Sequence, residues 1–448
     1  ESGLVMTGSD SFVSRPYGLL LETDTNAACT AATIGCPVFP GARAGDPFSL
    51  RIKAVAWQSD GEALTAAALA NNPVTPNFQL SGIALSSQLL APAGGSAGSL
   101  GAISYAHALG NQTTVSQSIS EVGVFSLTAT PTTSYFGTTV SGGTSGNVGR
   151  FIPKYLSAAG NASLTPACGS AFSYQGQQMA FAGAQEPSLT LTGRNAQNGV
   201  TGNYDRGSFW RLSTPGRDAY LSVTGRASLD TLGRLTASGS APAVVSGADD
   251  GDGARTYRWS GETLSYAAAS LPLADDLPFT AAVRQGFPSS ALTDADGACY
   301  LGTEASCQAF SFDFSNNPGS EVRLGRLRLD NAHGSELQPL ALPLWLESWQ
   351  SLGSSGVFRT EPADTCSGPL LGAISLASFT GNLQAGDTAA TLTAPLAGSG
   401  SIRLSAPGAG NDGSVAVSLP ALTWLWFDWN GTGRSPASAL ASFGVFQG

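Results

Sequence analysis

The sequence predicts an all-β protein, with tandem immunoglobulin-like β-sandwich domains followed by a larger β-rich C-terminal module. Short runs of alternating apolar and polar residues recur at roughly ten-residue intervals, separated by Gly, Pro, Asn and Asp, as is typical of sandwiches. The 448-residue chain contains 56 glycines and only 12% charged residues, which disfavours charged amphipathic helices. No long segment keeps a helical period, so helices should be few and short.

The alternating patterns divide the chain into three parts. The strongest early alternation is at 121–131, which predicts a strand of the first sandwich. The sequence VTGNYD at 200–205 resembles VTPNFQ at 74–79, which indicates that a second sandwich repeats the first. The expected domains are residues 1–147, 148–285 and 286–448. The third of these is a β-rich module that either stands alone or packs with the second as one unit.

The segment 322–346 has the clearest pattern in the chain and predicts a β-hairpin around which the C-terminal module is built. Leucines alternate with polar or small residues along both of its strands. A bulge is expected at Gly325 and a turn at 331–334. Pro343, which lacks an N–H donor, favours a sheet edge for the return strand.

Charged side chains on this hairpin permit two interpretations. Arg326, Arg328 and Glu336 can form a ladder of exposed ion pairs, each contributing under ~1 kcal/mol. Alternatively, they form a docking strip for a partner at an open sheet edge, where another strand can be added.

Charge and hydropathy exclude two classes of partner. The net charge is −10, and Lys53 and Lys154 are the only lysines, so no basic cluster could follow a phosphate backbone and nucleic acid is not expected. No apolar run approaches the ~20 residues of a membrane span. The chain does not begin with a basic segment and an apolar core, so any signal peptide is expected to lie upstream or to have been removed.

Six cysteines, an even number, suggest disulfides and an oxidising, extracellular compartment. The sequence permits 15 pairings. Proximity favours Cys29–Cys36 and Cys299–Cys307, which leaves Cys168–Cys366 by elimination. Six unpaired core thiols are the alternative.

Three acidic, glycine-containing loops are candidate calcium sites, since Ca²⁺ prefers carboxylate and carbonyl oxygens. The candidate ligands are Asp428, Asn430 and Thr432 in one loop, Asp294 and Asp296 in a second, and Asp249, Asp250 and Asp252 in a third. Each loop is otherwise a solvated turn, and no cofactor other than calcium is expected.

Two further patterns have competing interpretations. Trp424 and Trp426 could stack on sugar rings, but apolar residues on both faces of their segment favour a strand buried on both sides. Residues 94–98 match the G-x-S-x-G pattern of hydrolase nucleophiles without the strand and helix that this motif requires, so a low-complexity loop is favoured over a catalytic one.

Several motifs occur in the same order as in a known family: VGRFIP at 148–153, Cys168-x-x-x-Phe-x-Tyr174, Asp-x-Asp-Gly-x-Cys-Tyr at 294–300, and Asp364-x-Cys. With GRLRLDNAHGSE in the hairpin and FDWNG near the end, they resemble the C-terminal region of MshQ-like proteins. That family belongs to the mannose-sensitive haemagglutinin type IV pilus system of Gram-negative bacteria. The resemblance spans roughly 148–448 and implies export, a location on the cell surface or pilus, and adhesion, with no catalytic residues.

The sequence therefore favours a non-enzymatic, extracellular component of a type IV pilus, a tip or surface adhesin that docks to minor pilins and presents a receptor-binding surface. A calcium-assisted carbohydrate-binding module that recognises host or surface glycans is the alternative. A secreted hydrolase is a third alternative, for which the sequence contains little support beyond the isolated G-x-S-x-G pattern.

Overall fold

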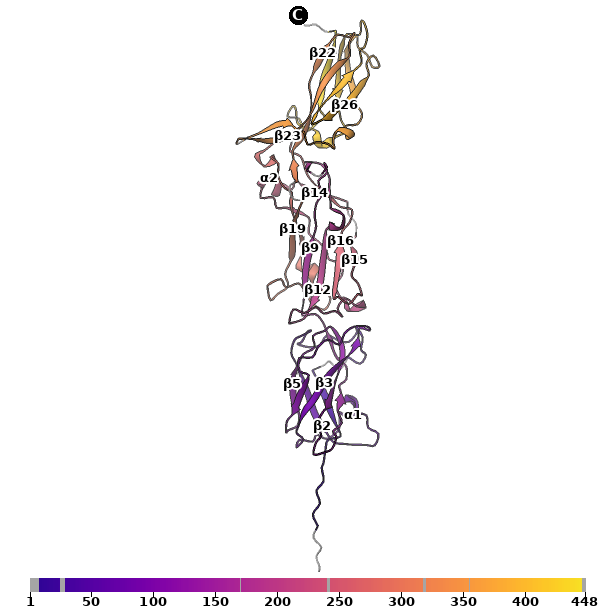
Figure 1. The fold of residues 1–448 in the computed structure, drawn as a ribbon, viewed down its shortest axis with the longest axis vertical. Helices are drawn as coiled ribbons and strands as arrows, with labels where there is room; N and C mark the ends of the chain where they lie inside the picture. Colours follow the sequence, from indigo (N-terminus) through magenta and orange to yellow (C-terminus); the bar gives the residue numbers. More distant parts are fainter. Residues whose placement is uncertain are drawn as a thin grey trace, which may run out of the picture.

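The computed structural model describes residues 8–24, 29–169, 171–239, 242–316, 320–353 and 355–444. Three β-rich units are stacked end to end in an elongated rod (Figure 1). The prediction of an all-β chain with tandem sandwiches is confirmed. The described part of the chain contains no helix long and apolar enough to cross a membrane.

The first unit is a sandwich of two antiparallel sheets. One sheet contains β1 (Gly18–Thr23), β2 (Phe48–Val55) and β5 (Thr113–Gln117). The other contains β4 (Ser104–His107), β3 (Leu80–Ala91), β6 (Gly123–Pro131), β7 (Gly143–Thr144) and β8 (Val148–Phe151). Alternation along β2 buries Leu50 and Ile52 against Phe125 of the facing sheet. The short helix α1 (Ala66–Leu69) begins at Thr65, whose hydroxyl accepts the N–H of Ala68.

The middle unit contains three smaller sheets. The first is β15 (Val244–Ser246), β16 (Ala254–Arg258), β12 (Ser188–Arg194) and β9 (Tyr155–Asn161). The second is β13 (Leu221–Ser222), β18 (Ala282–Phe287) and β19 (Phe310–Ser315), and the third is β11 (Met179–Ala180), β17 (Thr263–Tyr266) and β14 (Leu235–Ser238). Helix α2 is Ala227–Asp230. Two apolar cores form: one around Leu191 and Tyr204, the other around Leu264 and Phe279.

The structure shows the same local arrangement at both copies of the repeated sequence. In the first unit β1 pairs with β2, and Val55 at the end of β2 bridges to Val74. In the middle unit β9 pairs with β12, and Arg194 at its end bridges to Val200. Both VT segments therefore return to the end of the strand that precedes them.

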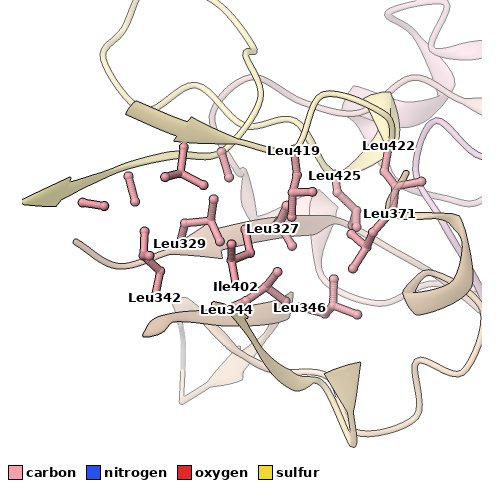
Figure 2. Packing of buried hydrophobic residues seen from close by; sticks show 14 of the residues in the cluster. Leu327, Leu329, Leu342, Leu344, Leu346, Leu371, Ile402, Leu419, Leu422 and Leu425 are labelled. Atoms are coloured by element: carbon pink, nitrogen blue, oxygen red, sulfur yellow. The ribbon is translucent and has the colours of Figure 1, made fainter. Parts of the chain in front are cut away.

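The C-terminal unit is a second large sandwich. One sheet contains β21 (Gly325–Leu329), β23 (Leu340–Leu352), β27 (Ser399–Leu404) and β26 (Ala390–Leu396), with β24 (Ser355–Thr360) against the far half of β23. The other contains β22 (Ala332–Gly334), β29 (Ser438–Phe443), β28 (Gly413–Ser418) and β25 (Ser375–Gly381). Figure 2 shows Leu327, Leu344, Ile402 and Leu425 meeting in the core between the sheets.

The predicted hairpin forms, with Leu327 opposite Leu346 in an unshifted antiparallel register. Three details of the prediction are wrong. The return strand β23 lies inside its sheet, between β21 and β27, and is not an edge. Residues 332–334 form β22, which crosses to the other sheet and pairs parallel with β29. The expected first strand is divided at Leu324 into β20 (Glu321–Arg323) and β21. Gly325 pairs regularly with Ser348, so there is no bulge at Gly325.

Two more strands connect the middle and C-terminal units. β10 (Phe172–Tyr174) pairs parallel with β20 (Glu321–Arg323). The expected boundary at 285/286 falls inside β18, whose partner β19 ends at Ser315.

The described chain also contains six 3₁₀ turns: Gly183–Gln185, Gly207–Phe209, Ala274–Asp276, Ser289–Leu292, Gly368–Leu370 and Thr423–Leu425.

Candidate functional site: the two junctions between units

The motifs singled out in the sequence gather at the two junctions of the rod. At the first junction the chain passes from the core of the first unit at Phe151 to the core of the middle unit at Leu156. The intervening Ile152 and Pro153 are themselves buried. The connection therefore contains no flexible linker.

A buried ion pair joins two of these motifs across the first junction. Arg150 of β8 donates from both terminal nitrogens to the carboxylate of Asp296, with Nη2 to Oδ1 at 2.9 Å. Both side chains are 8% exposed, and Arg150 also donates from Nε to the carbonyl of Cys36. Burial disfavours the Asp296 carboxylate, but the hydrogen bonds and charge of Arg150 hold its pKa below the usual range. This two-pronged geometry fixes orientation as well as distance.

Glu121 and Asn203 close the other side of the first junction. The Glu121 carboxylate accepts backbone N–H groups of Val122, Gly202 and Asn203, at 2.8–3.2 Å. Asn203 bonds the backbone N–H and carbonyl of Ser96. Ser96 of the G-x-S-x-G pattern thus lies in a structural contact between units. Burial raises the pKa of Glu121 despite these three donors.

Apolar contacts also cross the first junction. The Cys29–Cys36 disulfide of the first unit belongs to the core of the middle unit, together with Ala91 and Val124 from the ends of β3 and β6. These residues pack with Tyr204. The two units therefore share one apolar core at their contact, which makes independent movement costly.

At the second junction a segment of the middle unit is part of the C-terminal core. Phe172 and Tyr174 of β10 are fully buried among the leucines of the C-terminal sandwich. The Cys168–Cys366 disulfide joins positions 198 residues apart, with a Cα–Cα distance of 5.2 Å. The Tyr174 hydroxyl donates to Oδ2 of Asp364 at 2.9 Å. Burial, and then the Asp364 charge, raise the pKa of Tyr174, so it remains a donor.

Polar contacts from the middle unit complete the second junction. Val322 belongs to the second core of the middle unit, and Leu327, five residues later, belongs to the C-terminal core. Arg234 pairs with the fully buried Asp276 at 2.8 Å, where Gln175 also donates to the carboxylate. The segment from Val322 to Leu327 therefore passes directly from one core to the next, without a flexible linker.

Gly325 provides a test of the second junction. A Cβ at this position would overlap the Tyr174 ring and lie 2.9 Å from Cδ2 of Leu425. Gly325→Val is therefore expected to destabilise the protein by about 1–3 kcal/mol through overpacking. Urea unfolding of the intact chain measures this change. Gly216→Val, at an exposed position of the middle unit where a Cβ has no neighbour within 4 Å, is the space control. An unchanged midpoint for Gly325→Val would contradict the packing described for Tyr174.

The structure places the predicted disulfide cysteines together in three pairs: Cys29–Cys36, Cys168–Cys366 and Cys299–Cys307. It gives the Asp294 loop a role different from calcium binding. The Asp294 carboxylate accepts the Tyr204 hydroxyl and two backbone N–H groups, and Asp296 is held by Arg150. These carboxylates support the first junction.

The loop that begins at Asp428 differs from the Asp294 loop. Asp428 is half-buried, whereas Asn430 and Thr432 are exposed. Among the described residues, Asp428 does not lie close to two other acidic, His or Cys side chains that could hold a metal ion with it. In the remaining loop Asp250 and Asp252 lie beside Asp205, a residue that the sequence did not indicate. Asp249 is used locally, with Oδ1 accepting the N–H of Gly207.

The Trp-rich segment is not a buried strand. Residues 423–425 form a 3₁₀ turn. Leu425 in this turn and Phe427 after it are buried, and Trp424 and Trp426 are half-buried. The interpretation as a doubly buried strand is therefore wrong. Trp424 packs beside Gly176 of the middle unit, which assigns it to the second junction and leaves it poorly placed to stack on a sugar.

The predicted arginine strip is paired differently from expectation. Glu347 of β23, only 5% exposed at its side chain, pairs with Arg326 at 2.7 Å and with Arg328 at 3.2 Å. Arg326 also lies over the ring of Phe358. Glu336 does not form these pairs, and its backbone carbonyl accepts the N–H of Gly408. The prediction of the acidic partner was wrong because cross-strand register, which sequence spacing does not give, selects Glu347.

The chain matches models of one protein family and is similar in fold to several solved structures. No curated protein matches the chain. Solved structures that match include invasin, a bacterial integrin-binding protein, with 10% identity, TM-score 0.22, and coverage of 94% of this chain and 60% of invasin. Titin domains I67–I69 match with 9% identity and TM-score 0.22, covering 90% of this chain and 94% of that one. This chain thus spans less than two thirds of the invasin chain.

Family models account for nearly the whole chain. The second domain of DUF6701 matches residues 15–118, the third matches 121–313, and the fourth matches 323–448. The gap at 314–322 falls at the second junction. The match to the third domain begins before β6, β7 and β8, which complete the first sandwich in the structure, so the family boundary and the structural boundary differ there. The chain therefore belongs to the DUF6701 family, of which it carries the second, third and fourth domains.

Proposed function

We propose that this protein is an extracellular, non-enzymatic component of a type IV pilus system, and that its three units form a stiff stalk. In this role it is a tip or surface adhesin that docks to minor pilins and holds a receptor-binding surface away from the cell. The observation that carries the proposal is the construction of the junctions. Shared cores, buried ion pairs and a disulfide replace the flexible linkers that usually separate domains.

Chemistry and motif order support the proposed location and partners. Three disulfides within the described residues suit an oxidising environment outside the cytoplasm. The ordered motifs resemble those of MshQ-like pilus proteins, and four of them contribute junction contacts: Arg150 pairs with Asp296, and Cys168 and Tyr174 contact Cys366 and Asp364. Such junctions would keep a stalk extended, because bending it would disrupt packing that the neighbouring units share.

The proposal is tested by solution scattering and by capture of pilus components. We expect small-angle scattering of the intact chain to fit a single extended rod, and immobilised protein to retain purified minor pilins. An Asp60→Asn variant, altered at an exposed loop of the first unit, is the matched control and should behave like wild type.

Two results would contradict the proposal. Scattering that requires a broad range of bent shapes would contradict the stiff stalk. A glycan-array signal without retention of minor pilins would favour the alternative, a calcium-assisted carbohydrate-binding module. The predicted stacking residues Trp424 and Trp426 are half-buried, whereas Trp57 is 57% exposed. Trp429, edge-on against Phe427, is 37% exposed.

A further inference from the structure

A cluster of three carboxylates lies in the middle unit, close to the first junction. Asp250 and Asp252 project from the turn between β15 and β16, and Asp205 lies in the segment that follows β12. One carboxylate oxygen from each of the three lies within 4.8 Å of the others. Asp205 is about 46 residues away from the other two acids in sequence, so the fold brings it to them.

Asp205 is the unusual member of this cluster. Its side chain is completely buried, and its Oδ2 accepts the backbone N–H of Gly251 at 3.0 Å. Its Oδ1 is buried and has no hydrogen-bond partner among the residues that the structure describes. A buried carboxylate oxygen without a donor is unfavourable, because it has lost its hydrogen bonds to water and no protein donor replaces them. A bound cation would supply the missing interaction.

The exposed members each use one oxygen locally. Oδ1 of Asp250 accepts the N–H of Asp252 at 3.1 Å, and Oδ1 of Asp252 accepts the N–H of Ala254 at 2.8 Å. These bonds fix the turn and orient both side chains toward Asp205. Burial, and after it the nearby carboxylates of Asp250 and Asp205, raise the pKa of Asp252. Negative charge is therefore concentrated at this point.

The nearby arginines do not neutralise the cluster by direct pairing. Arg255 donates from Nη2 to the backbone carbonyl of Asp205 at 2.8 Å and lies over the Trp210 ring. Arg206 lies beside Gly251 and acts on Asp250 through its charge. Among the described residues, neither guanidinium comes within 4.0 Å of a carboxylate oxygen of the three acids.

We propose that Asp205, Asp250 and Asp252 form a calcium site. Three carboxylates from two loops match the oxygen ligands of Ca²⁺, which completes its six to eight positions with backbone carbonyls and water. Gly251, between the two exposed acids, also lines a groove of about 390 Å³ with Gly95 and Ser96 of the first unit. Calcium at this position stabilises the turn that borders the first junction. The inference does not depend on the pilus role.

Calorimetric titration of the intact, metal-free protein with CaCl₂ tests the site. We expect one Ca²⁺ per chain, with a dissociation constant of roughly 10⁻⁴–10⁻³ M, as in extracellular calcium modules, and a higher melting temperature than in EDTA. Asp250→Asn, at an exposed position, should weaken binding at least as much as the ~10–100-fold loss caused by changes around metal ligands. Asp205→Asn should abolish binding, and the exposed variant keeps the test valid if Asp205→Asn does not fold.

Asp428→Asn is the matched control, since Asp428 begins the competing calcium loop. It should leave the titration unchanged. Absence of binding heat up to 10 mM CaCl₂ (roughly ten times the weakest expected dissociation constant) would overturn the proposal. So would an unchanged affinity in Asp250→Asn, or binding that is lost in Asp428→Asn.

Discussion

Replacing Cys168 and Cys366 together by alanine is expected to lower the free energy of unfolding by up to about 5 kcal/mol. The estimate follows from the chain entropy that a cross-link over a separation of 198 residues removes from the unfolded state. The disulfide also fixes the segment that places Phe172 and Tyr174 in the C-terminal core. Urea unfolding of the intact chain, monitored by tryptophan fluorescence, measures the loss.

The Cys299–Cys307 pair is the matched control for this change. It closes a separation of only 8 residues within the middle unit, so its removal should cost about half as much, about 2.5 kcal/mol. Scattering provides a second measurement, because the long-range variant should bend at the second junction and the control should not. Equal losses of stability and an unchanged shape would show that the second junction does not depend on the disulfide.

Arg150→Ala is expected to destabilise the first junction by about 3–5 kcal/mol, because it leaves the Asp296 carboxylate buried without its main partner. The nearest remaining cation is Arg211, 3.7 Å from the carboxylate and 39% exposed. Arg284→Ala removes an exposed, solvent-screened pair with Asp313 and should leave the urea midpoint almost unchanged. Similar losses for the two variants would contradict the assigned importance of the buried pair.

The same pair gives a pH dependence with a defined sign. The pKa of Asp296 is lowered in the folded protein, so its contribution is complete above the unfolded-state value of about 4. It is lost as the pH falls through the folded-state value. The difference in midpoint between wild type and Arg150→Ala should therefore shrink in acid. A difference that stays constant, or grows, as the pH falls would contradict this role for Asp296.

Local sequence pattern predicted the elements well where one face of a strand is buried. Alternation identified β2, β6 and the β21–β23 hairpin, because a half-buried strand must place every second side chain in the core. The long-range cysteine pair followed from the two short-range pairs by elimination. Neither inference needed knowledge of how distant strands meet.

The pattern did not show which residues meet across units. Arg150 and Asp296 are 146 positions apart, and Asp205 meets Asp250 only because β12 and β16 are neighbours in one sheet. Alternation likewise identified β23 without showing that strands flank it on both sides. The Trp-rich run was misinterpreted because apolar residues on both faces fit a turn wedged between units as well as a central strand.

The contribution of β10 to the C-terminal sandwich has a consequence for dividing the protein into fragments. The family boundary at residue 323 separates the fourth domain from Cys168, Phe172 and Tyr174, although these residues fill its core. A fragment of residues 323–448 would carry an unpaired Cys366 and a vacant space opposite Gly325. The shortest fragment that contains the complete C-terminal core therefore begins before residue 168. We expect the fourth domain to fold correctly only when it is joined to the third.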